Sequence, residues 1–370
     1  MRIPLAMPDL SGNEERYVVQ AIRSSWISST GEFVTRFEQE FAGLCQVRTA
    51  IAVANGTVAL HLALLGMDAG PGDEVLVPSL TYVATANAVR YVGAEPVFVD
   101  VDPRTWCMDP GALTARITRR TKGIIAVHLY GHPADMDAIN AVAAAHDLWV
   151  IEDAAEAHLA RYKGRVVGSL GRVATFSFYG NKIFTSGEGG ALTLDDPALE
   201  RRLRILRGQG MDPARRYYFP ITGYNYRLTN VACAFLCAQL ERRQGILTRR
   251  QDIFRRYRDR LDGVPGIGFQ PVAPWAAPAP WLFSITVEPE RFGMTRDDLM
   301  AALERNGIET RPFFIPLHTL PPFAAPWRAR GEELPVTERL AASGLSLPTY
   351  SRLTDEQVDQ VAAAIRGLVR

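Results

Sequence analysis

Lysine is rare in this chain, which makes the position of each lysine informative. The 370-residue sequence has 41 basic residues, and only three of them are lysine: Lys122, Lys163 and Lys182. Arginine stays protonated at any usable pH, whereas a lysine with a lowered pKa can act as an amine nucleophile toward a carbonyl group. We interpret Lys122 and Lys163 as surface residues. Lys182 lies in SFYGNKIFTSGEGG, residues 177–190, and is the candidate for this chemistry.

Three other polar positions lie at the ends of strand-like runs or directly after them. Asp153 ends the run LWVIED, and Ser177 falls within RVATFSF, five residues before Lys182. Gly56-Thr57 follows TAIAVA and opens a helical segment, where free backbone N–H groups and a hydroxyl suit a phosphate. Each position alone has an ordinary alternative, since Asp153 could cap the next helix and every helix needs a cap.

Together these positions supply the parts of a pyridoxal 5'-phosphate site. That cofactor needs a lysine for its aldehyde, an acid opposite its pyridine nitrogen and donors for its phosphate. Lys182, Asp153 and the Gly56-Thr57 step provide these groups in turn. Tyr82, in SLTYVATANAV, could lay its ring against a planar ligand, and the glycines after Lys182 let the backbone approach it closely. No Cys or His spacing predicts a metal site.

The pattern of elements predicts where these residues meet. Short apolar runs alternate with helical segments over the first ~240 residues, which is typical of an α/β domain with a mainly parallel sheet. Functional residues in such sheets gather at the carboxyl ends of the strands. We therefore predict a large domain over 1–240 and a smaller α+β domain over 241–370. The proline-rich segment 271–281 is predicted to be an exposed connection.

Composition narrows the class of protein. A net charge of +1 gives no electrostatic basis for binding nucleic acid or an anionic membrane. No stretch approaches the ~18–20 apolar residues of a membrane span, and the first residues lack a signal-peptide pattern. We expect a cytoplasmic protein. A GxGxxG motif between a first strand and helix is also missing, which disfavours a nicotinamide-binding protein.

Eight segments spread over residues 26–319 resemble one family. They are WISSTGEFVTRFEQEFA, VANGTVALHLALL, VPSLTYVATANAVRYVGAEPVFVDVD, VHLYGHPADM, IEDAAEAH, TFSFYGNKIFTSGEGG, GYNYRLTN and ETRPFFIPLHT. The chain resembles the DegT/DnrJ/EryC1/StrS nucleotide-sugar aminotransferases, and among them the perosamine-synthase-like subgroup. The resemblance implies the aspartate-aminotransferase fold, fold type I of the pyridoxal phosphate enzymes, and transamination with pyridoxamine phosphate as intermediate.

The resemblance also implies a role for individual residues. Lys182 would be the Schiff-base lysine and Asp153 the partner of the pyridinium nitrogen. Phosphate ligands would be Ser177, Gly56 and Thr57, and Tyr82 would cover the ring. The remaining cofactor contacts would be Glu156, which stands where many relatives carry Gln, and Asn225, which would reach the phosphate of a neighbouring subunit in a homodimer with shared active sites.

Substrate contacts are less specific in the sequence. By the resemblance, Tyr226, Arg311 and His318 are candidates for contacts to a sugar or diphosphate, although His318 could be a turn histidine and Arg311 an ordinary ion pair. Glu156 and the SFYGNK segment favour transfer from L-glutamate to C4 of a nucleotide-linked 4-keto-6-deoxy sugar. The alternatives are a 3-keto nucleotide sugar or a cyclitol or antibiotic ketone precursor. The nucleotide and the pathway, O-antigen or antibiotic, stay open.

Overall fold

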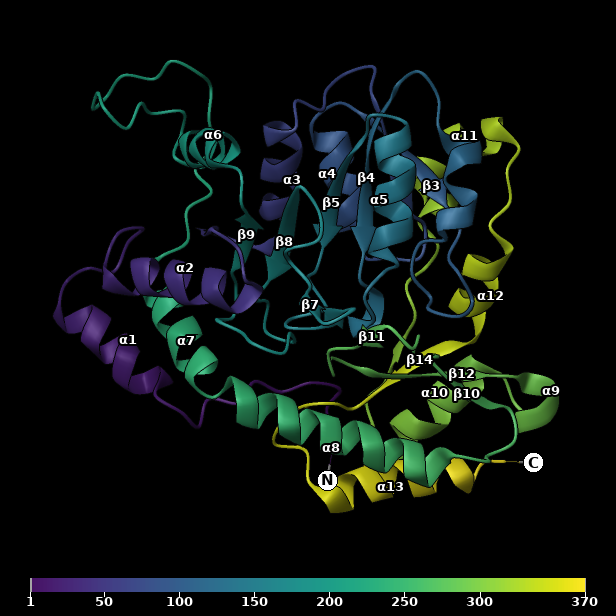
Figure 1. The fold of residues 1–370 in the computed structure, drawn as a ribbon. Coiled ribbons are helices and arrows are strands. Elements are labelled where there is room, and N and C mark those ends of the chain that lie inside the picture. The colour runs from purple at the N-terminus through teal and green to yellow at the C-terminus, as the bar shows by residue number, and fades with distance from the viewer. Residues whose placement is uncertain (1, 370) are drawn as a thin grey trace.

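A seven-stranded sheet lies at the centre of the larger part of the molecule, in a computed structural model that describes residues 2–369 (Figure 1). Its strand order is β1-β9-β8-β5-β4-β2-β3. The pairs from β8 to β3 are parallel, whereas β9 runs antiparallel to both β1 and β8. The strands are β1 (Thr49–Val53), β2 (Glu74–Pro78), β3 (Glu95–Val99), β4 (Thr121–Val127), β5 (Trp149–Asp153), β8 (Val173–Ser177) and β9 (Gly190–Leu194). The predicted mainly parallel sheet is confirmed.

Helices cover both faces of this sheet. Successive side chains of β1 alternate between the two cores, Ala50 and Ala52 on one side and Ile51 and Val53 on the other, as the period of a strand requires. The first face packs against α2 (Glu32–Cys45) and α5 (Met136–Ala145), and α7 (Asn230–Glu241) packs on α2 and α1 (Glu14–Arg23) in the same core. The second face packs against α3 (Gly56–Gly66), α4 (Ala84–Tyr91), α6 (Pro197–Arg207) and α11 (Pro321–Arg330). With both faces buried, most positions of these strands are apolar.

A four-stranded antiparallel sheet, in the order β10-β12-β14-β13, forms the smaller part. The long helix α8 and the last helix α13 lie side by side under it (Figure 1). Its elements are α8 (Arg243–Leu261), β10 (Ile267–Phe269), β12 (Phe283–Val287), α9 (Pro289–Phe292), α10 (Arg296–Arg305), β13 (Arg311–Pro312), α12 (Pro335–Ser343), β14 (Gly344–Leu347) and α13 (Asp355–Arg366). A separate apolar core, which includes Ile253, Phe283 and Leu345, holds it together.

Chain segments cross between the two parts in both directions. Ile3 pairs with Ile308 and belongs to the core of the smaller part. Phe323 and Trp327 of α11 return to the core on the second face of the large sheet. A division at residue 240 stays a prediction. Within residues 2–369, no helix is long and apolar enough to cross a membrane.

A further crossing lies between β10 and β12. Strand β11 (Ala276–Ala277) pairs with β6 (Arg161–Tyr162), which also pairs with β7 (Arg165–Val166) of the large part. Trp281 is only 2% exposed. The expectation of an exposed connection over 271–281 is therefore wrong at its carboxyl end, because the segment is paired and its last tryptophan is buried between the two parts.

Candidate active site

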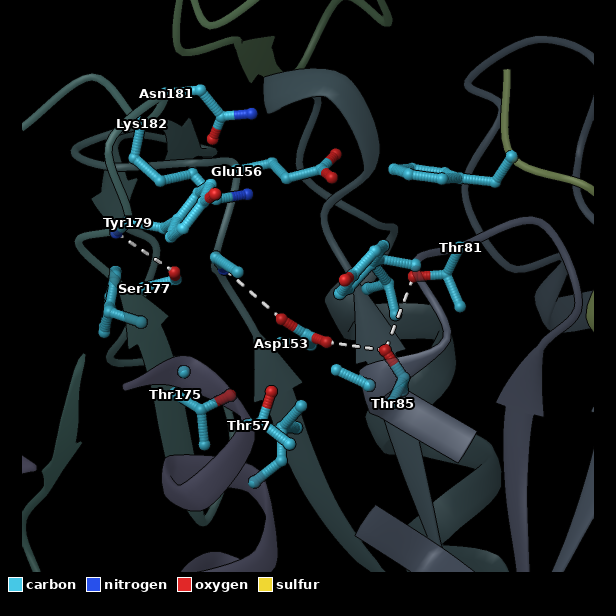
Figure 2. Close-up of a pocket in the computed structure, with 18 of the residues that line it drawn as sticks. Thr57, Thr81, Thr85, Asp153, Glu156, Thr175, Ser177, Tyr179, Asn181 and Lys182 are labelled. Atoms are coloured by element: carbon cyan, nitrogen blue, oxygen red, sulfur yellow. Dashed lines mark hydrogen bonds between the residues drawn. The ribbon is translucent and has the colours of Figure 1, made fainter. Parts of the chain in front are cut away.

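A cavity of about 670 Å³ opens at the carboxyl ends of the parallel strands (Figure 2). The large part contributes the turns after β1, β2, β5 and β8, as expected for a sheet of this topology. The smaller part closes the other side with Trp281, Arg311, Pro312, Phe313 and Phe314. Seven predicted site residues line this single cavity from the large part: Gly56, Thr57, Tyr82, Asp153, Glu156, Ser177 and Lys182.

Lys182 lies in the turn after β8, and its amine faces the cavity (Figure 2). Burial lowers the pKa of this amine, while the carboxylates of Glu156 and Asp153 oppose the shift without reversing it. The Lys182 Nζ lies 4.1 Å from the centroid of the Trp281 ring. No hydrogen bond or ion pair joins this amine to another described residue, so it is available to a ligand. A buried amine with a lowered pKa is a competent nucleophile.

Asp153 ends β5 and presents its carboxyl group to the same cavity. Its Oδ2 accepts a hydrogen bond of 2.8 Å from the Thr85 hydroxyl, and its Oδ1 accepts a longer bond of 3.3 Å from the Ala155 N–H. Burial raises the pKa of Asp153, although these bonds and the Lys182 charge act the other way. A cationic N–H group on a ligand would stabilise the ionised form by adding both a donor and a positive charge.

The amino end of α3 meets the end of β8 at the base of the cavity. Asn55 caps the helix by accepting a 3.0 Å bond from the Val58 N–H, which leaves the first backbone N–H groups free for an anion. A Cβ added to Gly56 would lie 2.8 Å from the Ser177 Cβ. Only glycine therefore allows this close approach of the helix to the Ser177 hydroxyl, and the Thr57 side chain lines the cavity beside them.

Two further predicted residues complete the walls of the cavity. Glu156 is buried, its Oε2 accepts a 2.8 Å bond from the Tyr130 N–H, and burial raises the pKa of its carboxyl group to about 7. Tyr82 is 59% exposed at the mouth, with its ring centroid 5.9 Å from that of Phe314. An aromatic face at this position can cover a planar ligand.

Sequence reasoning missed several lining residues. Thr85 orients Asp153, and its only signal is a position one helical turn after Tyr82. Asn181 has a buried Oδ1 without a partner among the described residues, and its backbone carbonyl accepts a 2.9 Å bond from the Trp281 indole. Phe313 and Phe314 approach from β13. Asn181 directly precedes Lys182, whereas Phe313 and Phe314 lie more than 100 residues away from it, so no pattern near the lysine marks the two phenylalanines.

The predicted substrate residues fall in different places. Arg311 lines the cavity. Tyr226 lies away from it, with its hydroxyl 2.9 Å from His61 Nδ1. Both ring nitrogens of His318 are occupied, Nδ1 by Ser79 and Nε2 by Glu338, and His318 also lies outside the lining. All three roles in binding substrate stay predictions, and the positions of Tyr226 and His318 outside the lining do not support theirs.

Asn225 is exposed and lies outside the cavity of its own chain. The short segment that carries it pairs with Gly208 at the end of α6. Between α6 and α7 the chain forms a loop that projects away from the rest of the molecule (Figure 1). A contact with cofactor therefore requires a second subunit, and it stays a prediction.

The residues present fit pyridoxal phosphate. A nucleophilic amine, a buried carboxyl group with spare acceptor capacity and a helix start beside a serine hydroxyl all face one cavity. The buried Oδ1 of Asn181 has no partner among the described residues and can accept a hydrogen bond from a ligand. Among residues 2–369, no cluster of His, Cys, Asp and Glu side chains could hold a metal ion.

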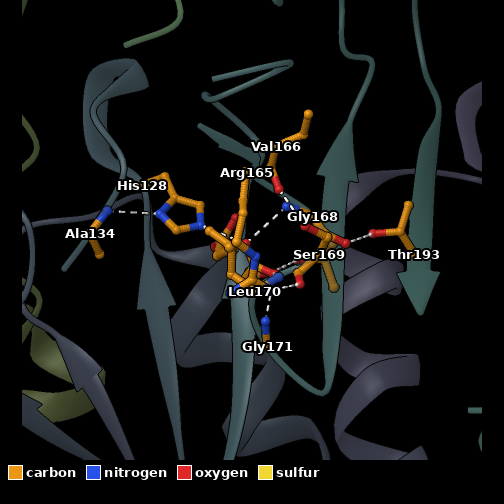
Figure 3. A network of polar contacts seen from close by, with 12 residues as sticks. His128, Ala134, Arg165, Val166, Gly168, Ser169, Leu170, Gly171 and Thr193 are labelled. Carbon is orange, nitrogen blue, oxygen red and sulfur yellow. Dashed lines mark hydrogen bonds and ion pairs between the residues drawn. The ribbon is translucent and has the colours of Figure 1, made fainter. Parts of the chain in front are cut away.

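A second buried polar cluster is centred on Glu152, the residue before Asp153 on β5, and includes His128 and the loop 168–171 (Figure 3). Glu152 is fully buried, and His128 Nε2 donates to its Oε2 at 3.1 Å. His128 Nδ1 accepts from the Ala134 N–H at 2.9 Å, which fixes the tautomer of a neutral ring. Three backbone N–H groups donate to the same carboxylate: Gly168 at 2.9 Å, Leu170 at 2.7 Å and Gly171 at 2.8 Å.

Comparisons with known proteins agree with this geometry. The profile of the DegT/DnrJ/EryC1/StrS aminotransferase family matches residues 8–366. The GDP-perosamine synthase of Caulobacter vibrioides is 49% identical over 365 residues, which cover 98% of this chain and 97% of that protein. DesI, solved in the presence of its TDP-sugar product, is 34% identical with a TM-score of 0.90, covering 98% of this chain and 91% of that chain. The PLP-form of a putative sugar aminotransferase, Spr1654 from Streptococcus pneumoniae, is 28% identical with a TM-score of 0.91, covering 100% and 98%. The fold is that of the sugar aminotransferases, as the sequence resemblance implied.

Proposed function

Because the chain belongs to the DegT/DnrJ/EryC1/StrS aminotransferase family, we propose that it transfers an amino group from L-glutamate to C4 of a nucleotide-linked 4-keto-6-deoxy sugar. Its cofactor is pyridoxal phosphate, which alternates with pyridoxamine phosphate. The observation that carries the proposal is the meeting of a nucleophilic Lys182 with the buried carboxyl group of Asp153 in one cavity. The name of the Caulobacter vibrioides relative supports the choice of C4 and of GDP as nucleotide.

The protein groups divide the work by position. When bound, the cofactor supplies an electron sink for negative charge that develops on the donor carbon. The Thr85 hydroxyl holds the Asp153 carboxyl group in place, and this carboxyl group would stabilise a positive charge on the ring nitrogen. Lys182 would hold the cofactor before the donor arrives and would then move a proton, which the lowered pKa of its amine permits.

Backbone N–H groups as well as side chains would hold the phosphate of the cofactor. Gly56 and Thr57 begin α3, Ser177 lies beside them, and the helix dipole favours an anion at this end. Glu156 and Tyr82 line the same cavity, where Glu156 would lie beside the cofactor ring and Tyr82 would cover it from the mouth. Arg311 is the cation that lines the smaller part's side and is suited to the substrate's diphosphate.

The assembly we propose is a homodimer in which Asn225 of each subunit completes the site of the other. Support comes from the exposed position of Asn225 and from the projecting loop before it. Mixing inactive Lys182→Ala chains with inactive Asn225→Ala chains should restore activity in heterodimers, because one intact site forms. A monomer that is fully active in sedimentation would contradict the shared site.

The reaction belongs in the cytoplasm. The four cysteines are unpaired and buried in the described structure, as is usual for a reducing compartment. No nucleic acid or membrane partner enters the proposal, since the net charge is only +1.

Single turnover of the pyridoxamine phosphate form tests the substrate. GDP-, dTDP- and UDP-linked 4-keto-6-deoxy hexoses are compared with a 3-keto nucleotide sugar and a cyclitol ketone. We expect the visible absorption of the pyridoxal form to return with the 4-keto sugars, fastest with GDP. A response to the 3-keto sugar or the cyclitol, and to none of the 4-keto sugars, would move the assignment to the alternative acceptor.

A further inference from the structure

The turn after β4 contains a buried residue in an uncommon backbone conformation. Tyr130 has φ 51° and ψ 28°, in the left-handed region that bulky side chains rarely adopt, and it is 3% exposed. Such a conformation persists only where surrounding contacts impose it, and it is frequent at functional sites. Here the Tyr130 N–H donates to Glu156 Oε2 at 2.8 Å. An acid that lines the cavity therefore holds the turn in place.

The ring of Tyr130 lies among three aromatic residues of the cavity lining. Its centroid is 6.2 Å from that of Trp281 at an interplanar angle of 15°, and 5.8 Å from that of Phe314 at 6°. Phe313 lies closest, at 4.6 Å and 36°. We call Trp281, Phe313 and Phe314 the aromatic wall. These residues belong to two segments of the smaller part that are about thirty positions apart, and Tyr130 contacts both.

Gly131, the next residue, makes a second contact with the segment that ends in Trp281. Gly131 has φ 91°, and a Cβ added to it would lie 2.0 Å from the carbonyl oxygen of Ala279. The Gly131 carbonyl accepts a 2.9 Å bond from the Ala279 N–H. Side chains larger than hydrogen would separate these two backbones. The Tyr130-Gly131 turn is therefore a joint between the large sheet and the segment that ends in Trp281.

We propose that Tyr130 is a positioning residue, which couples the place of Glu156 to the place of the aromatic wall and so shapes the part of the cavity that receives the keto sugar. This inference rests on the proposed function for its substrate, but the coupling itself concerns only residues of this chain. The amino donor is much smaller than a nucleotide sugar, so the donor reaction depends less on the wall.

Tyr130→Gly with Tyr130→Phe as control tests the role of the ring. Glycine accepts a positive φ and keeps the N–H that Glu156 binds, so the ring and its hydroxyl are lost while the turn is kept; Tyr130→Phe removes the hydroxyl alone. We expect Tyr130→Gly to raise KM for the GDP-linked 4-keto-6-deoxy hexose at least about 10-fold while kcat for the glutamate half-reaction changes less than about 3-fold. Tyr130→Phe should stay within about 2-fold of the unmodified enzyme in both. An equal rise of KM for glutamate and sugar would overturn the proposal.

Hydrogen exchange gives a readout that needs no turnover. In the cofactor-loaded protein, Tyr130→Gly should accelerate amide exchange in residues 279–283 and 312–316, whereas Tyr130→Phe should not. The visible absorption maximum of the bound cofactor should be the same in all three proteins. Unchanged exchange in both segments of Tyr130→Gly would overturn the coupling, whatever the kinetics show.

The Glu156 end of the coupling needs its own pair of variants. Glu156→Gln keeps an oxygen acceptor for the Tyr130 N–H, and Glu156→Ala removes it. We expect Glu156→Ala alone to accelerate exchange in 312–316, and the double variant with Tyr130→Gly to add little, because both changes break one unit. Full additivity would contradict the link. If the exchange results hold but no 4-keto sugar reacts with the unmodified enzyme, the failure belongs to the proposed function.

Discussion

The two sides of β5 carry adjacent carboxyl groups with opposite surroundings. Glu152 accepts four hydrogen bonds within its cluster, from His128 and three backbone N–H groups (Figure 3). Asp153 accepts two, from Thr85 and Ala155, and faces the cavity (Figure 2). Burial acts against ionisation of both, yet hydrogen bonds lower the pKa of Glu152 overall while the pKa of Asp153 stays raised. Alternation along the strand directs them to opposite sides.

This contrast separates a structural acid from a functional one. A carboxylate whose acceptor positions are filled by the protein has nothing left for a ligand, and its bonds fix the 168–171 loop and the turn after β4. A carboxyl group left with spare acceptor capacity in a buried cavity gains most from a cationic ligand. Both residues are acids, so residue type alone does not show which one is functional. Their hydrogen-bond partners do distinguish Glu152 from Asp153.

The largest expected effect on turnover comes from replacing Lys182, whose amine faces the cavity. Lys182→Ala should lower turnover by about 10⁴-fold or more, because it removes both the covalent attachment and the proton carrier. Borohydride reduction of the holoenzyme should fix the cofactor to one peptide that contains Lys182. Lys122→Arg and Lys163→Arg serve as matched controls and should keep full activity. A labelled peptide containing Lys122 or Lys163 would show that the site is misassigned.

Asp153→Asn should come next in size. The amide has nearly the shape of the acid and can keep a bond with Thr85, but it supplies no charge to hold a ring nitrogen protonated. We expect turnover to fall roughly 10²–10⁴-fold, the range of a lost acid–base contribution, while the cofactor stays bound. Absorption spectra confirm loading, and thermal unfolding confirms the fold. Near-normal turnover in the cofactor-loaded variant would show that Asp153 is not a functional acid and does not differ from Glu152 in this respect.

Glu152→Ala should act on stability instead. It leaves the His128 Nε2–H and three backbone N–H groups buried without an acceptor, and each such unsatisfied donor costs about 1–3 kcal/mol. Urea unfolding should show this loss, with a smaller one for Glu152→Gln, which keeps one acceptor oxygen. Turnover per folded molecule of Glu152→Gln should stay close to that of the unmodified enzyme. A collapse of kcat without loss of stability would place Glu152 among the functional acids.

The smallest expected effect is a pH dependence from Glu156. Burial raises its pKa from 4.5 to about 7 in the folded, cofactor-free protein. Between these values the folded state keeps the proton that the unfolded state releases, so the free energy of unfolding falls as pH rises, by roughly 3 kcal/mol. The fall should be complete above the folded pKa.

Comparison with Glu156→Gln isolates this contribution from that of the histidines. His132 and His158 have lowered pKa values of about 4 and about 3, and they shift stability in the opposite direction with pH. The difference between the two urea-unfolding profiles should therefore decline from about pH 5 to about pH 8. A flat difference would show that Glu156 stays ionised, satisfied by its bond from Tyr130, and so resembles Glu152.

The sequence by itself determined the larger part of the fold and one side of the cavity. Apolar runs alternating with helical segments predict a parallel sheet, and that topology forces Asp153, Ser177 and Gly56 to one edge, because parallel strands share their carboxyl ends. Lys182 was marked by the rarity of lysine and by the glycines after it. These features are local, so they can be read without knowing how the chain packs.

The opposite wall of the cavity depends on tertiary packing and could not be predicted from the sequence. Trp281 was expected in an exposed connection, yet pairing of β11 with β6 and the Tyr130-Gly131 turn bury it against Lys182. The unequal numbers of hydrogen bonds that Glu152 and Asp153 accept also depend on loops more than ten residues away in the sequence. Contacts between distant segments arise from packing of whole elements, and no pattern of neighbouring residues encodes which partners a side chain will find.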